Sequence, residues 1–355
     1  MPPFVNGSDA IRLSVVIVTH NSSAAVTAAL PALASQLGAG DELIVVDNAS
    51  TDDTVAVVGA LAPQAIVVDS PHNSGFAGGA NAGARRASGD LLLFLNPDAT
   101  PADGFAQAIR RPLLDASGWA AWMGLVTAER GRVINTSGGV VHFTGIAWAG
   151  EAGRPVAGAA ENAREVAFVT GACLAVPRVT WDRVGGFAED FFMYHEDVDI
   201  SLRLRLAGGR LGIEPSAVVD HDYEFLKAAA KWRYLERNRW ATILRTYPTL
   251  LLVLLAPALL ATEIALLAAS TKAGWATQKL RATTETLRSL KSLLRQRREI
   301  QAGRRISSSD FARWLSPDLD SAYLGRAATS PVLRRLLRGY WAVVLAVLRL
   351  ETQRR

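Results

Sequence analysis

Apolar runs and helical patterns alternate along the first hundred residues. The apolar, β-branched runs lie at 13–19, 43–47, 65–69 and 91–95, and helical spacing lies between them at 22–37, 51–61 and 77–88. Continuous apolar strands separated by helices are typical of a parallel sheet covered on both faces. We therefore predict an α/β domain. Ser50, followed three residues later by Asp53, predicts the N-cap of the second helix.

The pattern weakens and then returns in the second hundred residues. Residues 101–165 are rich in Gly and Ala and predict only short strands and loops. Periodicity then predicts a strand at 166–176 and helices at 179–184, 196–207 and 226–246. Ligands of such sheets bind beyond the carboxyl ends of the strands, so polar residues at those ends are the first candidates for a site.

After Pro248 the chain becomes apolar and then basic. Residues 249–270 carry one charge, Glu263, and are long enough to span a bilayer, although a buried Glu there is costly. Residues 276–305 and 331–350 predict basic amphipathic helices, which commonly lie in a membrane interface. The alternative is a helical hairpin packed on the protein's own body. We predict two domains, residues 1–247 and residues 248–355.

Charge sharpens this division. Residues 1–270 carry 20 lysines and arginines against 27 aspartates and glutamates, a net −7, whereas residues 271–355 carry 18 against 6, a net +12. A basic tail indicates an anionic partner, either a membrane or a nucleic acid. The basic residues alternate with Leu, Val and Trp at helical spacing and form no nucleic-acid recognition motif, so a membrane is favoured.

The remaining composition narrows the class of protein. The single cysteine, Cys173, excludes a disulfide scaffold and indicates a reducing compartment. The first ten residues lack the pattern of a signal peptide, and we expect none.

Polar side chains follow three of the predicted strands. Thr19 and Asn21 follow the first, Asp47 ends the second, and Asn96 and Asp98 follow the fourth. Two carboxylates at one edge of a sheet suit a nucleotide site, although Asp and Asn also terminate turns. The glycine-rich segment 72–81 could approach a phosphate at the start of a helix, but it lacks the G-x-G-x-x-G spacing of dinucleotide sites.

Three carboxylates, Glu196, Asp197 and Asp199, follow the aromatic run at 191–194. Acidic residues favour a helix N-terminus, which accounts for one or two of them. A carboxylate next to an apolar run is partly desolvated, which raises its pKa and suits a general base. His221 ends a short strand-like run, where a lone His is more often structural than a metal ligand.

Taken in order, these segments resemble the family 2 glycosyltransferases of the GT-A fold. The resemblance covers residues 12–245 and rests on VVIVTHN at 15–21, VVDNASTDDT at 45–54, NSGFAGGANAG at 73–83, FLNPDA at 94–99, GACLAVPR at 171–178, GGFAEDFFMYHEDVDISLRLRLAG at 185–208 and PSAVVDH at 215–221. Within this family, the chain most resembles the subgroup of bacterial rhamnosyltransferase-like and galactofuranosyltransferase-like enzymes that build cell-envelope polysaccharides.

The resemblance implies a role for each matching residue. Asp47 contacts the base of the donor nucleotide, and the other donor-binding residues are Thr19, Asn21, Asn73, Gly75 and Asn96. Asp98 matches the last acid of the D-x-D motif and His221 completes a site for Mg²⁺ or Mn²⁺, with Asn96 in place of the first acid. Asp197 matches the catalytic base, and Glu196, Gly171, Arg239 and Trp240 shape the acceptor side. Glu236–Trp240 resembles the Q-x-x-R-W motif of processive relatives, with Glu in place of Gln.

The resemblance implies an inverting, metal-dependent transferase that moves a sugar, first choice L-rhamnose from dTDP-rhamnose, to a lipid-linked saccharide in cell-envelope polysaccharide synthesis. UDP-galactofuranose and a UDP-hexosamine are alternative donors. We expect it at the cytoplasmic membrane face, either peripheral or with residues 249–270 inserted, and a homo-oligomer stays open.

Two other classes compete with the transferase. A sugar-phosphate nucleotidyltransferase would need a basic, glycine-rich loop after the first strand, where this chain has THNSSAAV. A catalytically silent sugar-binding or scaffold protein would not need Asp47, Asp98, Asp197 and His221 together.

Overall fold

A ten-stranded mixed sheet forms the centre of the computed structural model, which describes residues 11–159, 162–222, 231–321 and 330–353. Eight strands follow the order β10-β12-β6-β11-β4-β1-β2-β3, with β5 paired to β12 and β7 to β6. The strands of this sheet are β1 Leu13–Thr19, β2 Glu42–Asp47, β3 Ile66–Asp69, β4 Leu91–Leu95, β5 Thr100–Pro101, β6 Trp119–Ala128, β7 Val133–Thr136, β10 Arg164–Glu165, β11 Cys173–Pro177 and β12 Arg210–Asp220. A smaller sheet joins β13 Leu315–Ser316, β8 Gly139–His142 and β9 Ala147–Ala149.

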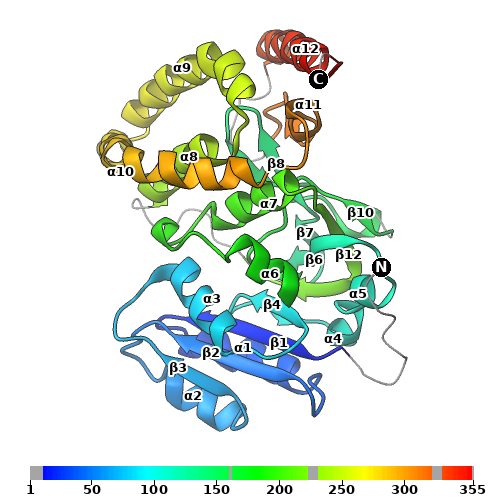
Figure 1. Cartoon of the computed structure of the whole chain (residues 1–355). Coiled ribbons are helices and arrows are strands. Elements are labelled where there is room, and N and C mark those ends of the chain that lie inside the picture. The colour runs from blue at the N-terminus through cyan, green and yellow to red at the C-terminus, as the bar shows by residue number, and fades with distance from the viewer. Residues whose placement is uncertain (1–10, 160–161, 223–230, 322–329, 354–355) are drawn as a thin grey trace.

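The first half of the chain confirms the predicted alternation. β3, β2, β1 and β4 are parallel neighbours, and every residue of β4 is buried. The helices between them are α1 Ser23–Ala34, α2 Thr54–Leu61 and α3 Gly75–Arg86 (Figure 1). The predicted Ser50 cap is wrong: α2 begins at Thr54, and Ser50 instead donates hydrogen bonds to Asp47.

The second half of the sheet differs more from the prediction. Residues 101–165 contain β6, a ten-residue strand in the middle of the sheet. A Cβ on its Gly124 would lie 2.2 Å from the Ala217 carbonyl oxygen, so close contact with β12 requires glycine there. The predicted strand at 166–176 shortens to β11, because Val166–Ala172 turns away to form a loop beside α7.

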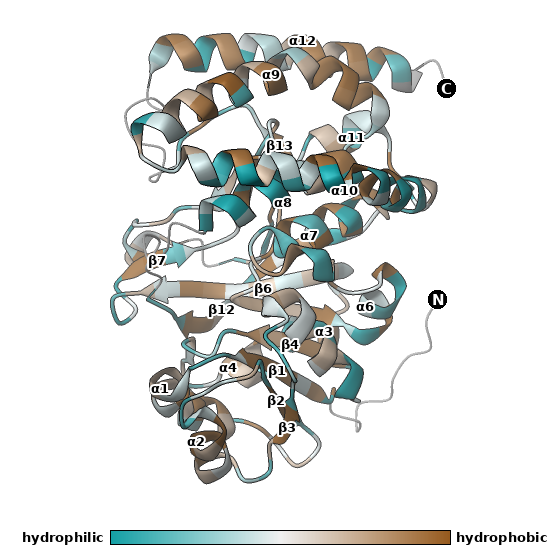
Figure 2. Ribbon diagram, turned by 90° about the vertical axis from the view of Figure 1, so that its left-hand side faces the viewer, coloured by the Kyte–Doolittle hydropathy of each residue, from teal (hydrophilic) through white to brown (hydrophobic). Residues whose placement is uncertain are grey.

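Helices cover the sheet and extend beyond it (Figures 1 and 2). The short helices α4 Phe105–Ala108 and α5 Arg111–Leu114 precede β6, while α6 Arg178–Val184 and α7 Glu196–Leu206 follow β11. The C-terminal helices are α8 Lys231–Thr246, α9 Thr249–Lys272, α10 Ala276–Ala302, α11 Ser308–Ala312 and α12 Pro331–Gln353. Residues 226–230 of the predicted helix, and residues 1–10 on which the signal-peptide expectation rests, lie outside the described residues.

The C-terminal helices share a hydrophobic cluster with the body of the protein. It joins Phe143 and Leu202 to Tyr247, Leu251 and Trp341. The sequence-based boundary at residue 248 stays a prediction, and this cluster lies across it. In the described part of the chain, α9 is the one helix long and apolar enough to cross a membrane. Its buried positions are spaced four residues apart at Leu251, Leu255 and Leu259, which places one stripe of the helix against the protein.

Candidate active site

The carboxyl ends of β1 and β2 form one rigid polar unit. Thr19 lies beside Asp47 in the register of the two strands, and its hydroxyl donates to the Asp47 carboxylate over 3.1 Å. The Ser50 N–H and hydroxyl donate to the same carboxylate at 2.9 and 2.5 Å. Asn21 accepts a 2.8 Å hydrogen bond from the Thr51 N–H, which joins the two loops. Thr19, Asn21 and Asp47, which the sequence predicted to bind the donor nucleotide, therefore lie together.

Asn48 connects this unit to the glycine-rich segment. Its side chain is 1% exposed, donates to the Gly75 carbonyl oxygen over 2.8 Å and accepts from the Ser74 hydroxyl over 3.0 Å. Asn73 accepts from the Gly75 N–H over 2.8 Å, so both predicted residues of this loop lie in the same turn. A Cβ on Gly75 would lie 2.3 Å from the Phe192 carbonyl oxygen, so its missing side chain admits that loop.

Asn96, Asp98 and His221 converge beyond β4 and β12. The Asp98 Oδ1 atom lies 3.0 Å from His221 Nε2, and the Asn96 amide lies 3.3 Å from the same imidazole nitrogen. The His221 backbone is fixed by Thr127 and by Asn135, whose amide donates to the His221 carbonyl oxygen over 2.8 Å. Residues more than 120 positions apart in the chain thus form one polar group.

This group fits a divalent cation. Two ligands at adjacent corners of an octahedron, each about 2.1 Å from Mg²⁺, are separated by about 3.0 Å, which is the spacing of Asp98 Oδ1 and His221 Nε2. Among the described residues no set of three or more His, Cys, Asp or Glu gathers as a metal site. A carboxylate and an imidazole suit Mg²⁺ or Mn²⁺ when substrate phosphates and water supply further oxygen ligands.

Asp197 lies beside the short segment at residues 171–172, which follows Thr170. The Gly171 N–H donates to Asp197 Oδ2 over 3.1 Å, and the Val198 N–H donates to its Oδ1 over 2.8 Å. The Ala172 carbonyl oxygen accepts from the Asn96 N–H over 3.1 Å. Residues 171–172 therefore connect the Asp197 carboxylate to the loop that carries Asp98.

The three carboxylates at the start of α7 have different surroundings. Asp199 is fully buried and pairs with Arg203 over 2.7 Å and with Arg245 over 3.2 Å, which makes it structural. Burial raises the pKa of Glu196 well above its ordinary value, and the neighbouring Asp197 charge raises it further. Burial also raises the pKa of Asp197, against the opposing hydrogen bonds from Gly171 and Val198. A carboxylate of raised basicity can accept a proton more readily.

The loop before these carboxylates is strained. Phe192, Tyr194 and His195 all have positive φ, between 64° and 67°, a conformation that side chains disfavour by about 1–3 kcal/mol each. Asn238 of α8, which is fully buried, holds the loop by donating to the carbonyl oxygens of Phe191, Met193 and Tyr194 at 2.9, 3.0 and 2.7 Å. Such strain persists where the surroundings impose it, and it is common beside catalytic groups.

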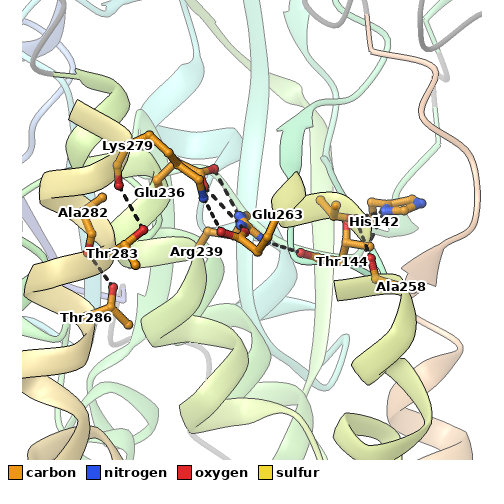
Figure 3. A network of polar contacts seen from close by, with 11 residues as sticks. His142, Thr144, Glu236, Arg239, Ala258, Glu263, Lys279, Ala282, Thr283 and Thr286 are labelled. Atoms are coloured by element: carbon orange, nitrogen blue, oxygen red, sulfur yellow. Dashed lines mark hydrogen bonds and ion pairs between the residues drawn. The ribbon is translucent and has the colours of Figure 1, made fainter. Parts of the chain in front are cut away.

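Arg239 and Trp240 differ in their environment. Arg239 is 2% exposed and joins Glu236 of α8, Glu263 of α9 and Lys279 of α10 in one ion-pair cluster (Figure 3). Burial alone would raise the pKa of Glu236, but the Arg239 and Lys279 charges lower it to about 2. Trp240 is partly buried and packs on the hydrophobic cluster around Tyr247. Of the two predicted residues, Arg239 is the one that lines a cavity together with His195.

Sequence reasoning missed the asparagines that position the site. Asn48, Asn135 and Asn238 all donate to backbone carbonyl oxygens of loops that carry candidate residues. Asn238 had a usable signal, because asparagine is unfavourable inside a helix unless its side chain has a partner elsewhere. Asn48 directly follows β2, where asparagine is common and carries no such signal. Asn135 lies within β7, and asparagine is unusual in strands, so it also had a signal.

Comparison with known proteins assigns the family. Residues 14–124 match the profile of Glycosyl transferase family 2, and residues 156–347, more than half of the chain, match that of Glycosyl transferase family group 2. The N-acetylglucosaminyl-diphospho-decaprenol L-rhamnosyltransferase of Mycobacterium tuberculosis is 48% identical over 58 residues, 16% of this chain. This match spans about a fifth of that enzyme, 19% of its length.

Two solved structures support the same fold. The crystal structure of GalNAc-T7 with UDP, GalNAc and Mn²⁺ has a TM-score of 0.56 at 14% identity, over 68% of this chain and 49% of its own. Mannosyltransferase PcManGT from Pyrobaculum calidifontis, in complex with GDP-Man and Mn²⁺, has a TM-score of 0.51 at 20% identity, over 83% of this chain and 86% of its own. The predicted fold class is confirmed, and the chain belongs to the family 2 glycosyltransferases, with a GT-A type of fold.

Proposed function

We propose that this glycosyltransferase moves a sugar from a nucleoside diphosphate donor to a hydroxyl of a lipid-linked saccharide, with inversion at the anomeric carbon. The observation that carries the proposal is the convergence on residues 171–172: Gly171 holds the Asp197 carboxylate and Ala172 holds Asn96, two residues before Asp98. A base and a diphosphate site are thereby fixed on one short segment.

Asp197 acts as the general base in this mechanism. The acceptor hydroxyl must lose its proton as its oxygen attacks the anomeric carbon, and the Asp197 carboxylate accepts that proton. The nucleoside diphosphate leaves from the opposite face, so a single displacement inverts the centre. No carboxylate nucleophile is required, in contrast to the covalent route of retaining glycosidases.

Asp98 and His221 would hold a divalent cation against the donor diphosphate, with Asn96 beside them. Such a cation, when bound, stabilises the negative charge that develops on the departing diphosphate. Thr19, Asn21 and Asp47 form the adjoining polar unit and would bind the nucleoside, while the Asn73–Gly75 turn closes the same edge of the sheet.

The sugar and the acceptor rest on the similarity to the mycobacterial rhamnosyltransferase. We take dTDP-rhamnose as the first donor and a saccharide on a polyprenyl diphosphate as the acceptor. UDP-galactofuranose and UDP-hexosamines are the alternatives to test. The decisive experiment incubates the protein with each sugar nucleotide, Mn²⁺ or Mg²⁺, and N-acetylglucosaminyl-diphospho-polyprenol, and follows release of the nucleoside diphosphate. Release only by hydrolysis, with no glycosylated lipid for any donor, would contradict the proposal.

The C-terminal helices would hold the enzyme on the anionic cytoplasmic face of a membrane. Fourteen of the nineteen exposed large apolar side chains among the described residues lie between 253 and 350, although this stretch is less than a third of the chain. They include Val253, Leu260 and Ile264 on α9 and Leu336 and Val343 on α12. α9 and α12 lie side by side at the end of the molecule farthest from β3 (Figure 2).

An orientation parallel to the membrane surface suits α9 better than a transmembrane one. Glu263 continues the stripe of Leu251, Leu255 and Leu259, and its carboxylate is paired with Arg239 and Lys279 rather than facing outward. The opposite side of the helix is exposed and apolar. Flotation with liposomes tests this peripheral association: we expect the protein to bind vesicles that contain anionic lipid, and high salt to reduce that binding. A protein that remains with the soluble fraction would contradict membrane association.

A further inference from the structure

A cavity of about 210 Å³ lies between α9 and the strained loop at residues 192–195, which we call the catalytic loop because it leads into Asp197. Its walls are mainly apolar, with Ile146 and Trp148 from the β9 region, Trp232 and Leu235 from α8, Leu266 from α9, and Trp275 from the start of α10. The Trp232 and Trp275 rings stack, with centroids 4.7 Å apart and planes 13° apart. Pockets that enclose a whole small molecule measure roughly 300–1,000 Å³, so this cavity suits one part of a larger ligand.

The cavity adjoins both halves of the candidate active site. His195, which lines it, directly precedes Glu196 and Asp197. Asn135, which also lines it, donates a hydrogen bond to the His221 carbonyl oxygen. Burial, and then the charge of Arg239, lowers the pKa of His195 to about 4, so its imidazole is uncharged at neutral pH. A ligand held here would therefore lie beside the acceptor side of the site.

Most polar side chains of the cavity are already engaged; the exception is His195, whose buried Nδ1 atom has no hydrogen-bond partner among the described residues. Glu236 and Arg239 are satisfied by one another and by Lys279 and Glu263. A sugar buried here would need hydrogen bonds for its hydroxyls, and a polar group left unpaired on burial costs binding energy. An apolar ligand meets no such cost and gains from contact with the three tryptophans.

The wall of the cavity leads to the exposed apolar surface of α9. Leu266 is half-buried at the cavity, and its neighbours Ile264 and Leu267 are 64% and 44% exposed. Lys231, next to Trp232, places its ammonium group 5.1 Å from the centre of the Tyr194 ring, which adds a positive charge between the cavity wall and the catalytic loop. A ligand made of a diphosphate followed by an apolar chain matches this arrangement: the diphosphate would lie near the Lys231 charge, and the chain would lie in the cavity and along α9.

We infer that this cavity binds the first isoprenoid units of the lipid carrier of the acceptor, and so positions the attached saccharide at Asp197. The inference rests on the proposed function, because it assumes a polyprenyl diphosphate acceptor. The inference goes beyond the proposed function by assigning a lipid-binding site to the junction of α8, α9 and β9. The rest of the polyprenyl chain would leave along α9.

The test compares two leucines and two acceptors. Leu266→Asn makes the cavity wall polar, and Leu114→Asn makes the same change at a 59% exposed leucine of α5 that does not line the cavity. Transfer is measured with N-acetylglucosaminyl-diphospho-polyprenol and with methyl N-acetylglucosaminide, at saturating donor. We expect Leu266→Asn to raise the KM for the polyprenyl acceptor by about 10-fold and to leave the methyl glycoside kinetics unchanged. Leu114→Asn should leave both unchanged.

A second variant and a binding assay guard against misfolding and against an inactive enzyme. Ala149→Leu fills the cavity from β9 and should reproduce the KM effect. A benzophenone-bearing geranyl diphosphate should crosslink to residues 266–275 or 146–149 of the wild-type protein, whether or not transfer is seen. Equal effects on both acceptors would assign the cavity to the sugar, and crosslinking elsewhere or unaltered kinetics in both cavity variants would overturn the inference. Crosslinking in the cavity without any transfer would instead refute the proposed function alone.

Discussion

The Asp197 carboxylate accepts a hydrogen bond from the Gly171 backbone N–H over 3.1 Å. This contact brings the start of α7 to the end of a loop that precedes β11, and the next residue of that loop holds Asn96. The carboxylate is thus fixed by backbone N–H groups, from the loop before β11 and from α7, rather than by a mobile side chain. In the proposed role as general base, a carboxylate fixed in this way loses little orientation freedom when an acceptor arrives.

Replacing the base should stop the chemistry and spare the donor site. For Asp197→Asn we expect kcat to fall by about 10²–10⁴-fold, since the amide cannot accept the proton. The affinity for nucleoside diphosphate, measured by calorimetry, should stay within twofold. Asp182→Asn, an exposed carboxylate on α6, is the matched control and should behave like wild type. Normal turnover by Asp197→Asn would refute the base assignment.

The buried Glu196 should make the protein less stable as pH rises. Its pKa in the folded state lies well above 4.5, because of burial and then the Asp197 charge. The native state therefore holds the proton more tightly than the unfolded chain, so this stabilisation is complete below about pH 4 and is lost as pH rises through the folded pKa.

Glu196→Gln removes this titration and tests it. Its Tm should exceed that of wild type at pH 7–8 and approach the wild-type value near pH 4, in a series of thermal melts. Parallel curves for the two proteins would show that Glu196 does not carry the effect.

Chelation should reveal the proposed cation site. EDTA should reduce transfer by at least about 100-fold, and added Mn²⁺ or Mg²⁺ should restore it. Asp98→Asn and His221→Ala should weaken cation activation, measured as the metal concentration that gives half-maximal rate. Asp103→Asn, an exposed carboxylate after β5, is the control. Full activity of the dialysed enzyme in EDTA would exclude a metal-dependent mechanism.

Loss of Asn238 should release the strained loop. Asn238→Leu keeps the approximate volume but removes three hydrogen bonds to loop carbonyl oxygens, and we expect about 1–3 kcal/mol of lost stability. Activity should fall further than the small unfolded fraction explains, because residues 192–195 lead directly into Glu196. Urea unfolding and transfer assays on one sample separate the two effects. Unchanged activity in a folded variant would assign Asn238 to stability alone.

Glu263 should be more important for stability than its place in an apolar helix suggests. Glu263→Gln leaves Arg239 and Lys279 with Glu236 as their one remaining carboxylate in the cluster, at a cost of about 3 kcal/mol. The double variant Glu263→Gln/Lys279→Met restores the charge balance and should recover much of the loss. Glu299→Gln, exposed on α10, should have no effect. Denaturant unfolding measures all three, and additive losses in the double variant would contradict the coupling.

The parts of the fold that depend on local pattern were predictable. β1 to β4 and α1 to α3 follow from apolar runs and helical spacing, which are visible within a few residues. β6 was not, because its residues Ala121 and Gly124 have low strand preference and are selected by contact with β12. The Ser50 cap failed for a local reason: the carboxylate of Asp47, three residues earlier, accepts a hydrogen bond from that hydroxyl, and α2 begins at Thr54.

The candidate site was predictable as a set of residues but not as an arrangement. The sequence placed Asp47 and Asp98 at strand ends, and the structure brings Asp98 to His221 across more than 120 positions. It could not show that Glu263 is paired with Arg239, since that contact depends on how α9 packs on α8. The catalytic and binding roles of the candidate site residues stay predictions until the variants are measured.

The contact of Gly75 with Phe192 has a consequence for the order of substrate binding. The Ala77 N–H donates to the Phe192 carbonyl oxygen over 3.0 Å, and no side chain separates the two loops at Gly75. A donor that shifts the Asn73–Gly75 turn must also shift Phe192, and with it the strained residues before Asp197. Acceptor affinity should then depend on donor occupancy, so initial-rate kinetics should give a compulsory sequence with the sugar nucleotide first. Gly75, which has no side chain, would in this way set the order in which the sugar nucleotide and the acceptor bind.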